Sequence, residues 1–244
     1  MAKNLKLDSV TGDIRLKQVG NANELKLRST SLTNADALAV NTLYEAVRLR
    51  DPETAEHCLN VARLALAMAV RFDPSNAALH YAAGLVHDVG KMGMPDAILK
   101  SPDRLDKRGK LITMRHASDG ADLIKRLNLP VFLVEAVEHH HERYDGSGYS
   151  HSLSGVDIPL SSRILAIADT WTALTSGRPY MVAKTPMEAL KIMADEAILF
   201  DPDVLDWFMS GMTNGDVYRQ HAAMHSRSVP NALKSLVVEQ DQGK

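Results

Sequence analysis

Cysteine is almost absent from this chain, with Cys58 as the single one among 244 residues. One thiol excludes an internal disulfide framework and fits a reducing compartment. No apolar run reaches the roughly 20 residues that a bilayer-crossing helix needs. The basic segment of residues 1–7 also lacks the apolar core that follows it in a signal peptide. The sequence therefore predicts a cytoplasmic protein that makes no use of a membrane.

An excess of charge of one sign is missing too. The chain has 28 Lys and Arg residues against 30 Asp and Glu residues, and its formal net charge is −2. Proteins that wrap a long nucleic acid need a basic surface, so a long nucleic acid is not an expected partner. The hydrophobic share of 45% and the charged share of 24% are typical of a globular protein. The length suits one domain with extra segments, or two small domains.

The hydrophobic pattern changes near residue 34. Residues 13–17 and 24–28 alternate with a period of two, which is typical of short strands, so residues 1–33 are expected to form an arm that contains them. Beyond it the apolar residues recur at helix spacing. Helices are expected from residue 34, over 52–72, 76–88, 106–127, 131–141, 160–174 and 203–212, and from 185, with a loop over 142–159. The predicted fold class is all-α with a β appendage, followed by a polar tail over residues 216–244.

Residues of metal-ligand type are spread over these expected helices. They are Glu53, His57, His87, Asp88, His116, His140, His141 and Asp169. Imidazole together with carboxylate suits a first-row transition ion such as iron, manganese or zinc, whereas an all-oxygen set would suit magnesium. A set of this size could hold two ions that share a hydroxide, an arrangement suited to in-line attack on phosphorus.

Structural interpretations compete with this one at each position. Glu53 and His57 lie four residues apart, as in many surface pairs on one helix face. Asp88 could cap a helix, and Asp169, in an apolar helix, could pair with an arginine, Arg163 or Arg178 being the candidates. The remaining histidines are interpreted as surface or core residues: His80, His151, His221 and His225. Metal binding is favoured because the candidates fall on separate helices that one bundle can bring together.

Three segments carry a more specific pattern. They are His87-Asp88-Val89-Gly90-Lys91, then His140-His141-Glu142-Arg143-Tyr144-Asp145-Gly146-Ser147-Gly148-Tyr149, then Asp169 followed by Ala173-Leu174-Thr175-Ser176-Gly177-Arg178-Pro179-Tyr180. On these segments the chain resembles the HD-GYP family, the cyclic di-GMP phosphodiesterase branch of the HD phosphohydrolase superfamily. The likeness covers roughly residues 34–212. It implies an HD-domain helical bundle with two extra helices and a loop with the Gly-Tyr-Pro signature (the GYP loop), in a catalytic domain over residues 34–215.

The resemblance also implies roles for individual residues. The metal ligands would be His57, His87, Asp88, His116, His140, His141 and Asp169, with Asp88 as the bridging carboxylate. Glu53 stands where some members hold a third ion, so two or three divalent ions are implied, iron or manganese in preference and zinc also compatible. Asp88 and Lys91 would be catalytic, with Lys91 on the scissile phosphate. Asp145, Tyr149 and Arg178 would contact the ligand or shape its pocket.

Three positions depart from the family pattern. Ser150 stands where Pro usually follows Gly-Tyr, and Thr172 stands where a second acid usually follows three residues after the metal-binding Asp. Met181 replaces the lysine of an Arg-Pro-Tyr-Lys element, and Lys184 could substitute for it. None of these changes removes a metal ligand. They bear on ligand affinity and guanine specificity.

The predicted function is hydrolysis of cyclic di-GMP, or a related cyclic dinucleotide, by a hydroxide that bridges the metals. The product would be linear pGpG, and GMP if the pocket admits the opened chain. Two alternatives remain open. The chain could be a catalytically weak module that binds cyclic dinucleotides or docks a partner, or a hydrolase of another nucleotide phosphoester. A signalling-protein partner or a homodimer is compatible with each of them.

Overall fold

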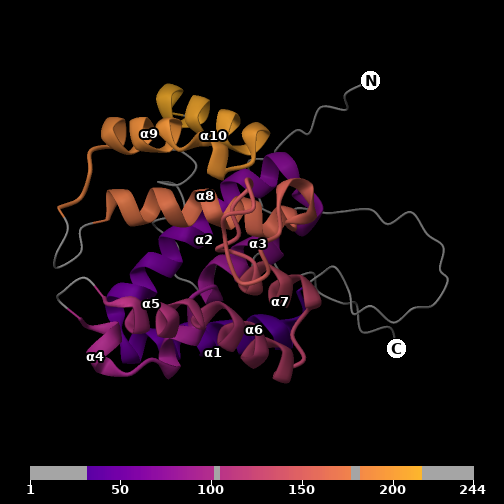
Figure 1. Cartoon of the computed structure of the whole chain (residues 1–244). Coiled ribbons are helices and arrows are strands. Elements are labelled where there is room, and N and C mark those ends of the chain that lie inside the picture. The colour runs from indigo at the N-terminus through magenta and orange to yellow at the C-terminus, as the bar shows by residue number, and fades with distance from the viewer. Residues whose placement is uncertain (1–31, 102–104, 177–181, 216–244) are drawn as a thin grey trace, which may run out of the picture.

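Helices make up all the regular structure of the part of the chain that the computed structural model describes, residues 32–101, 105–176 and 182–215 (Figure 1). The α-helices are α1 (Asn34–Arg50), α2 (Pro52–Phe72), α3 (Ala77–Val86), α4 (Asp96–Leu99), α5 (Lys107–Met114), α6 (His116–Arg126), α7 (Val131–Glu138), α8 (Leu160–Thr175), α9 (Pro186–Asp195) and α10 (Pro202–Asn214). Short 3-10 helices lie at η1 (Pro74–Asn76), η2 (Val89–Gly93), η3 (Gly155–Asp157) and η4 (Ala197–Leu199). The predicted all-α class is confirmed. The expected strands at 13–17 and 24–28 and the expected tail over 216–244 lie outside the described residues.

The central helix is α2, which packs against α1, α3 and α8. Every residue from 61 to 69 is buried, and several of them are alanines, whose small side chains let neighbouring helices approach closely. The approach of α3 is especially close: a Cβ placed on Gly84 would lie 2.4 Å from the Cα of Ala62. This contact between the two backbones fixes where the end of α3 lies relative to α2.

The remaining helices lie on two sides of this centre. Figure 1 shows α9 and α10 beyond α8, and α1, α4, α5 and α6 on the opposite side. Contacts of α8 with both α9 and α10 support this arrangement. Within the described ranges, none of the helices combines the length and the apolar character that crossing a bilayer requires.

Three expected helix boundaries are wrong. The expected helix over 131–141 ends at Glu138, so His140 and His141 follow α7 and are not part of it. The expected helix over 76–88 ends at Val86, and Gly90 lies inside η2 instead of ending a helix. The expected helix over 106–127 is two helices, α5 and α6, because the ring of His116 donates a hydrogen bond from Nδ1 to the Thr113 carbonyl at 2.6 Å. In a continuous helix the backbone N–H four residues on would use that carbonyl. The break therefore places His116 at the first position of a new helix.

A polar link joins the end of α2 to α3. Asp73 accepts a hydrogen bond of 3.0 Å from Nε2 of His80, and the Asn76 side-chain amide donates to both of its carboxylate oxygens. The His80 hydrogen bond is the main cause that lowers the pKa of the Asp73 carboxyl below its ordinary value. His80 is fully buried, with its ring edge-on to Phe132. It lies in the core, away from the ligand-type residues.

We expect Asp73→Asn to lower the free energy of unfolding by about 1–2 kcal/mol at pH 7, because a hydrogen bond to a charged group is replaced by a neutral one. The folded-state pKa of Asp73 is depressed, so its stabilising contribution is present above the ordinary value of 3.8 and is lost as the pH falls through the folded pKa. Urea unfolding of both proteins at pH 7, 5 and 3 measures this. A difference that stays constant over the whole pH range would contradict it.

Candidate metal centre

The predicted ligands, Glu53 excepted, meet in one place although they come from different helices. His57 lies on α2, His87 and Asp88 lie between α3 and η2, His116 begins α6, His140 and His141 directly follow α7, and Asp169 lies on α8. Two groups have ligand atoms that all lie within 4.8 Å of one another: His57, His87 and Asp88 in the first, and His116, His140 and His141 in the second. Far-apart segments of the chain thus supply one cluster.

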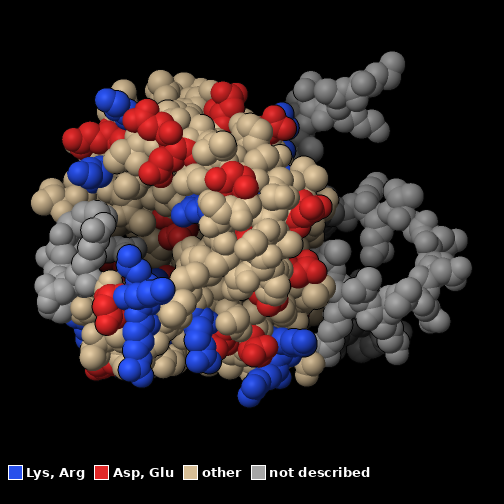
Figure 2. Space-filling model, in the orientation of Figure 1, with Lys and Arg blue, Asp and Glu red and all other residues tan. Residues whose placement is uncertain are grey.

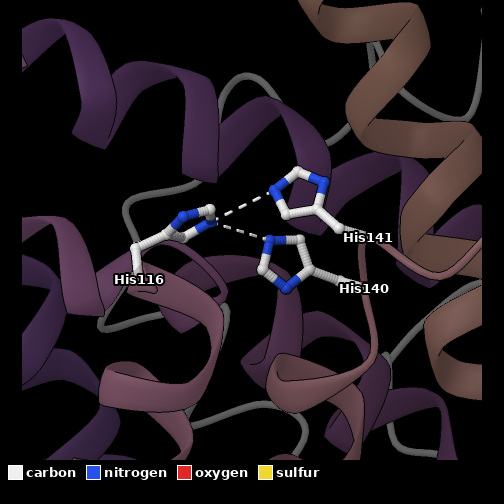
Figure 3. Close-up of side chains that lie close together, drawn as sticks. All are labelled: His116, His140 and His141. Carbon is white, nitrogen blue, oxygen red and sulfur yellow. Dashed lines mark hydrogen bonds between the residues drawn. The ribbon is translucent and has the colours of Figure 1, made fainter. Parts of the chain in front are cut away.

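The second group is a set of three imidazoles that face one another (Figure 3). Nε2 of His116 lies 3.2 Å from Nε2 of His140 and 3.1 Å from Nε2 of His141. The Nδ1 atoms of His116 and His140 donate hydrogen bonds of 2.6 Å to the carbonyls of Thr113 and Val137. Those carbonyls can only accept, so the protons lie on Nδ1, and both Nε2 atoms present lone pairs to each other. Such a contact is repulsive unless a cation lies between the two nitrogens.

The separation of these nitrogens also fits an ion. Metal–nitrogen bonds of about 2.0–2.1 Å put two adjacent imidazole ligands about 3.0–3.4 Å apart. Ligating histidines in proteins characteristically donate their other ring N–H to a carbonyl or carboxylate, which fixes the tautomer. Backbone carbonyls perform that task here, and the donor set therefore fits a divalent ion.

The first group has the same character. Nδ1 of His87 donates a hydrogen bond of 2.8 Å to the Gly84 carbonyl. The Nε2 atoms of His57 and His87 are buried and have no hydrogen-bond partner among the residues that the structure describes. Nε2 of His57 lies 2.9 Å from Oδ1 of Asp169 without the alignment of a hydrogen bond. Buried ring nitrogens without hydrogen-bond partners and a carboxylate oxygen thus converge at one point.

Asp88 joins the two groups. Its Oδ1 lies 3.2 Å from Nε2 of His116, and its Oδ2 lies 3.4 Å from Nε2 of His87 and 2.6 Å from Nζ of Lys91. Its side chain is 2% exposed and makes no capping hydrogen bond to η2, which it precedes. The capping interpretation is therefore wrong. The carboxylate is positioned so that each oxygen faces one of the two groups.

Charges around Asp88 keep it ionised. Burial alone would raise the pKa of its carboxyl, but Lys91 and His87 outweigh burial and hold the pKa well below the ordinary value. Burial likewise would lower the pKa of Lys91, and the Asp88 carboxylate reverses this and raises it. A fixed positive charge therefore lies beside the cluster.

The histidines differ in their readiness to bind an ion. Burial lowers the pKa of His141 to about 3 and that of His140 well below its ordinary value, with neighbouring imidazoles adding to the effect. Both rings are thus neutral, the form that binds metals. For His87 burial lowers the pKa, but Asp88 outweighs it and raises the pKa well above the ordinary value. An ion would displace a proton at His87.

A glycine allows Asp88 to reach His116. A Cβ placed on Gly90 would lie 2.0 Å from the carbonyl oxygen of His116 and 2.7 Å from the backbone nitrogen of Gly120. The start of η2 therefore rests directly on the backbone of α6. The sequence motif His-Asp-x-Gly-Lys contains this glycine, but the motif alone does not predict that the glycine contacts the backbone of α6.

The other predicted residues that the structure describes belong to neither of the two ligand groups. Glu53 is exposed, one turn before His57, and neither ligand group includes it within the described part of the chain. Asp145 is exposed and accepts hydrogen bonds from the backbone and the hydroxyl of Ser147, so it shapes the turn. Tyr149 stacks on the ring of His141, with centroids 4.8 Å apart. Arg178 lies outside the described residues.

The departures from the family pattern and the predicted arginine partner can also be placed. The hydroxyl of Thr172 is buried and donates to the Ala168 carbonyl of its own helix at 2.7 Å, so it offers nothing to the cluster. Ser150 and Lys184 are exposed, and Met181 lies outside the described residues. Arg163 forms an ion pair with Asp201. The interpretation of Arg163 as the partner of Asp169 is therefore wrong.

A hollow opens on the face of the molecule between α8 and α5. Figure 2 shows acidic atoms recessed in this hollow, and Lys and Arg side chains along its lower edge. Positive charge at the rim attracts an anionic ligand, and recessed carboxylates attract cations.

Comparison with known proteins gives the family. A family model described as an HD domain matches residues 33–204. The chain belongs to the HD-domain family. Over 177 residues it is 36% identical to a cyclic di-GMP phosphodiesterase of Pseudomonas aeruginosa, an alignment that covers 70% of this chain and 43% of the relative. The resemblance to the HD-GYP branch is confirmed.

Two further similarities extend the comparison. Over 116 residues the chain is 41% identical to the 3'3'-cGAMP-specific phosphodiesterase 1 of Vibrio cholerae, covering 48% of this chain and 27% of that one. The crystal structure of a cyclic GMP-AMP phosphodiesterase of V. cholerae superposes with a TM-score of 0.58 at 16% identity, over 86% of this chain and 55% of that chain. The HD-domain fold is thus shown. This HD-domain chain spans less than half the length of the two curated relatives.

Gly90→Ala should destabilise the metal-free protein by about 2–3 kcal/mol, because the added methyl group must push η2 away from α6. It should also lower the amount of bound metal, since Asp88 moves away from His116. Gly93→Ala is the matched control, because a Cβ on Gly93 of the same 3-10 helix meets nothing within 4 Å. Urea unfolding and elemental analysis measure both quantities. Equal behaviour of the two variants would refute the close contact as the cause.

Proposed function

We propose that this chain is a metal-dependent phosphodiesterase that hydrolyses cyclic di-GMP, or a closely related cyclic dinucleotide, to the linear dinucleotide. For cyclic di-GMP the product is pGpG, with further cleavage to GMP set by whether the site admits the opened chain. The observation that carries the proposal is the placement of Asp88 between two groups of inward-facing imidazole nitrogens. The curated relatives act on cyclic dinucleotides by their names, which supports the substrate class.

The cluster would hold two ions. His57, His87 and Asp169 would hold the first ion, His116, His140 and His141 the second, and Asp88 would be shared between them. Mixed imidazole and carboxylate ligands favour iron or manganese, and zinc is also compatible. Glu53, one turn before His57 on α2, is in sequence position for a third ion. When bound, such ions lower the pKa of a coordinated water and offset the charge of the phosphate.

The chain's own residues would position and neutralise the substrate. Lys91, with its ammonium group next to Asp88, would offset charge on the non-bridging phosphate oxygens. The ring of Tyr149, stacked on His141, would border the site on the side of the GYP loop. Asp145 would act through the turn that it shapes with Ser147, and Arg178 would contact the ligand.

A second substrate is favoured by one specific observation. The matched part of the chain is 41% identical to a relative named for 3'3'-cGAMP, and the departures at Ser150 and Met181 fall in segments expected to shape the ligand pocket. Parallel turnover measurements with cyclic di-GMP, 3'3'-cGAMP and simple phosphodiesters decide between them. Tight binding of a cyclic dinucleotide without product, with iron and with manganese, would instead favour a binding or partner-docking module.

Asp88→Asn should lower cyclic dinucleotide turnover by about 100-fold or more, since the shared carboxylate loses its charge, and should reduce bound metal. Asp157→Asn is the matched control, because Asp157 is exposed on the loop after the GYP segment. Product formation by chromatography and metal content by elemental analysis are the measurements. Unchanged turnover in Asp88→Asn would refute the proposed function.

Lys91→Gln should separate the role of the lysine from metal binding. We expect turnover to fall by about 10²–10³-fold with the metal content kept, because a single preorganised positive charge is removed. Lys191→Gln, on the exposed side of α9, is the control. Loss of metal together with activity would show that Lys91 supports the centre and not the phosphate.

A further inference from the structure

Another group of ligand-type side chains lies next to the proposed centre and is separate from it. His139, Glu142 and His151 have ligand atoms that all lie within 4.8 Å of one another. The rings of His139 and His151 are 5.0 Å apart, and Nδ1 of His139 lies 4.0 Å from Oε1 of Glu142. His139 directly follows α7, Glu142 begins the loop over residues 142–159, and His151 lies further along that loop. The group therefore links the two ends of a loop segment.

The buried polar atoms of this group are not satisfied. Glu142 is 2% exposed, and its Oε1 accepts a hydrogen bond of 2.7 Å from the backbone nitrogen of His151. Its Oε2 and the Nδ1 of His139 are buried and have no hydrogen-bond partner within the described ranges. A buried carboxylate without full pairing costs several kcal/mol. A cation between these atoms would satisfy both.

A fourth side chain, that of Glu138, lies beside this group. Oε1 of Glu138 lies 3.7 Å from Nε2 of His151, and this carboxylate is partly exposed. Two carboxylates and two imidazoles match the nitrogen and oxygen donors that zinc accepts in a four-coordinate site. The side chain of His151 is 49% exposed, so its ring has room to move closer to the carboxylates when an ion binds.

We propose that His139, Glu142 and His151 form a second metal site, for a divalent transition ion of the zinc type, with Glu138 as a further ligand. The ion ties the GYP loop to the end of α7. Tyr149 precedes His151 by two residues and stacks on His141, so the same ion holds the tyrosine beside the first centre. This site goes beyond the proposed phosphodiesterase activity and does not depend on it.

The test counts zinc in the 244-residue chain. Metal-stripped wild type, His151→Gln and Val156→Gln are titrated with Zn²⁺ in competition with a chromophoric chelator, and bound zinc is confirmed by elemental analysis. Val156→Gln is the matched control, because it puts the same side chain on the same loop at an exposed position outside the group. The wild type and Val156→Gln should bind one equivalent more than His151→Gln. Equal stoichiometry in wild type and His151→Gln overturns the proposal.

Glu142→Gln separates metal binding from the loop contact. Its amide oxygen still accepts the hydrogen bond from the His151 backbone, but the charge is gone. We expect the same loss of one zinc equivalent with an unchanged circular dichroism spectrum, and retention of that equivalent overturns the proposal. In Asp88→Asn this equivalent should persist whatever the turnover, so a failure of this site and a failure of the phosphodiesterase proposal give different results.

Discussion

The cluster of inward-facing imidazoles around Asp88 is the feature on which the rest of this structure depends. Nε2 of His116 and Nε2 of His140 lie 3.2 Å apart with their protons on the opposite sides of the rings. Without a cation this arrangement brings lone pairs together and leaves buried nitrogens unused. Positive charge beside Asp88, from Lys91, offsets only the carboxylate. Cations between the ligand groups resolve both problems at once, and this makes metal binding the physical basis of the functional proposal.

The helices bring these side chains together through close contacts between backbones. Gly84 lets α3 rest on α2 at Ala62, and Gly90 lets η2 rest on α6 at His116. Each contact excludes even a methyl group. The carbonyls that orient the rings of His116 and His140 lie near the ends of two other helices, since Thr113 is in the last turn of α5 and Val137 in the last turn of α7. The position of the ligands therefore depends on close contacts between backbones, and the orientation of their rings depends on where α5 and α7 end.

The histidines that follow α7 belong to two different groups of ligand-type side chains. His140 and His141 face the cluster with Asp88, while His139 faces Glu142 and His151. Successive residues at a helix end point in different directions, about 100° apart in a helix, so three adjacent histidines do not share one site. The GYP loop lies between these two groups, with Tyr149 against one and His151 in the other.

Sequence by itself determined the helical class, most helix positions and the residue types of the cluster around Asp88, because apolar spacing and side-chain chemistry can be recognised along the chain itself. The sequence left the structural interpretations of Asp88 and Asp169 open, because an aspartate looks the same in the sequence whether it caps a helix, pairs with an arginine or binds a metal. Tertiary structure decided the first, by leaving Asp88 without a capping bond, and it excluded Arg163 as the partner of Asp169 by pairing it with Asp201. It also decided the break at His116 and the pairing of His151 with Glu142. Both features depend on which segments of the chain meet in space, and the spacing of residues along one helix does not predict those contacts.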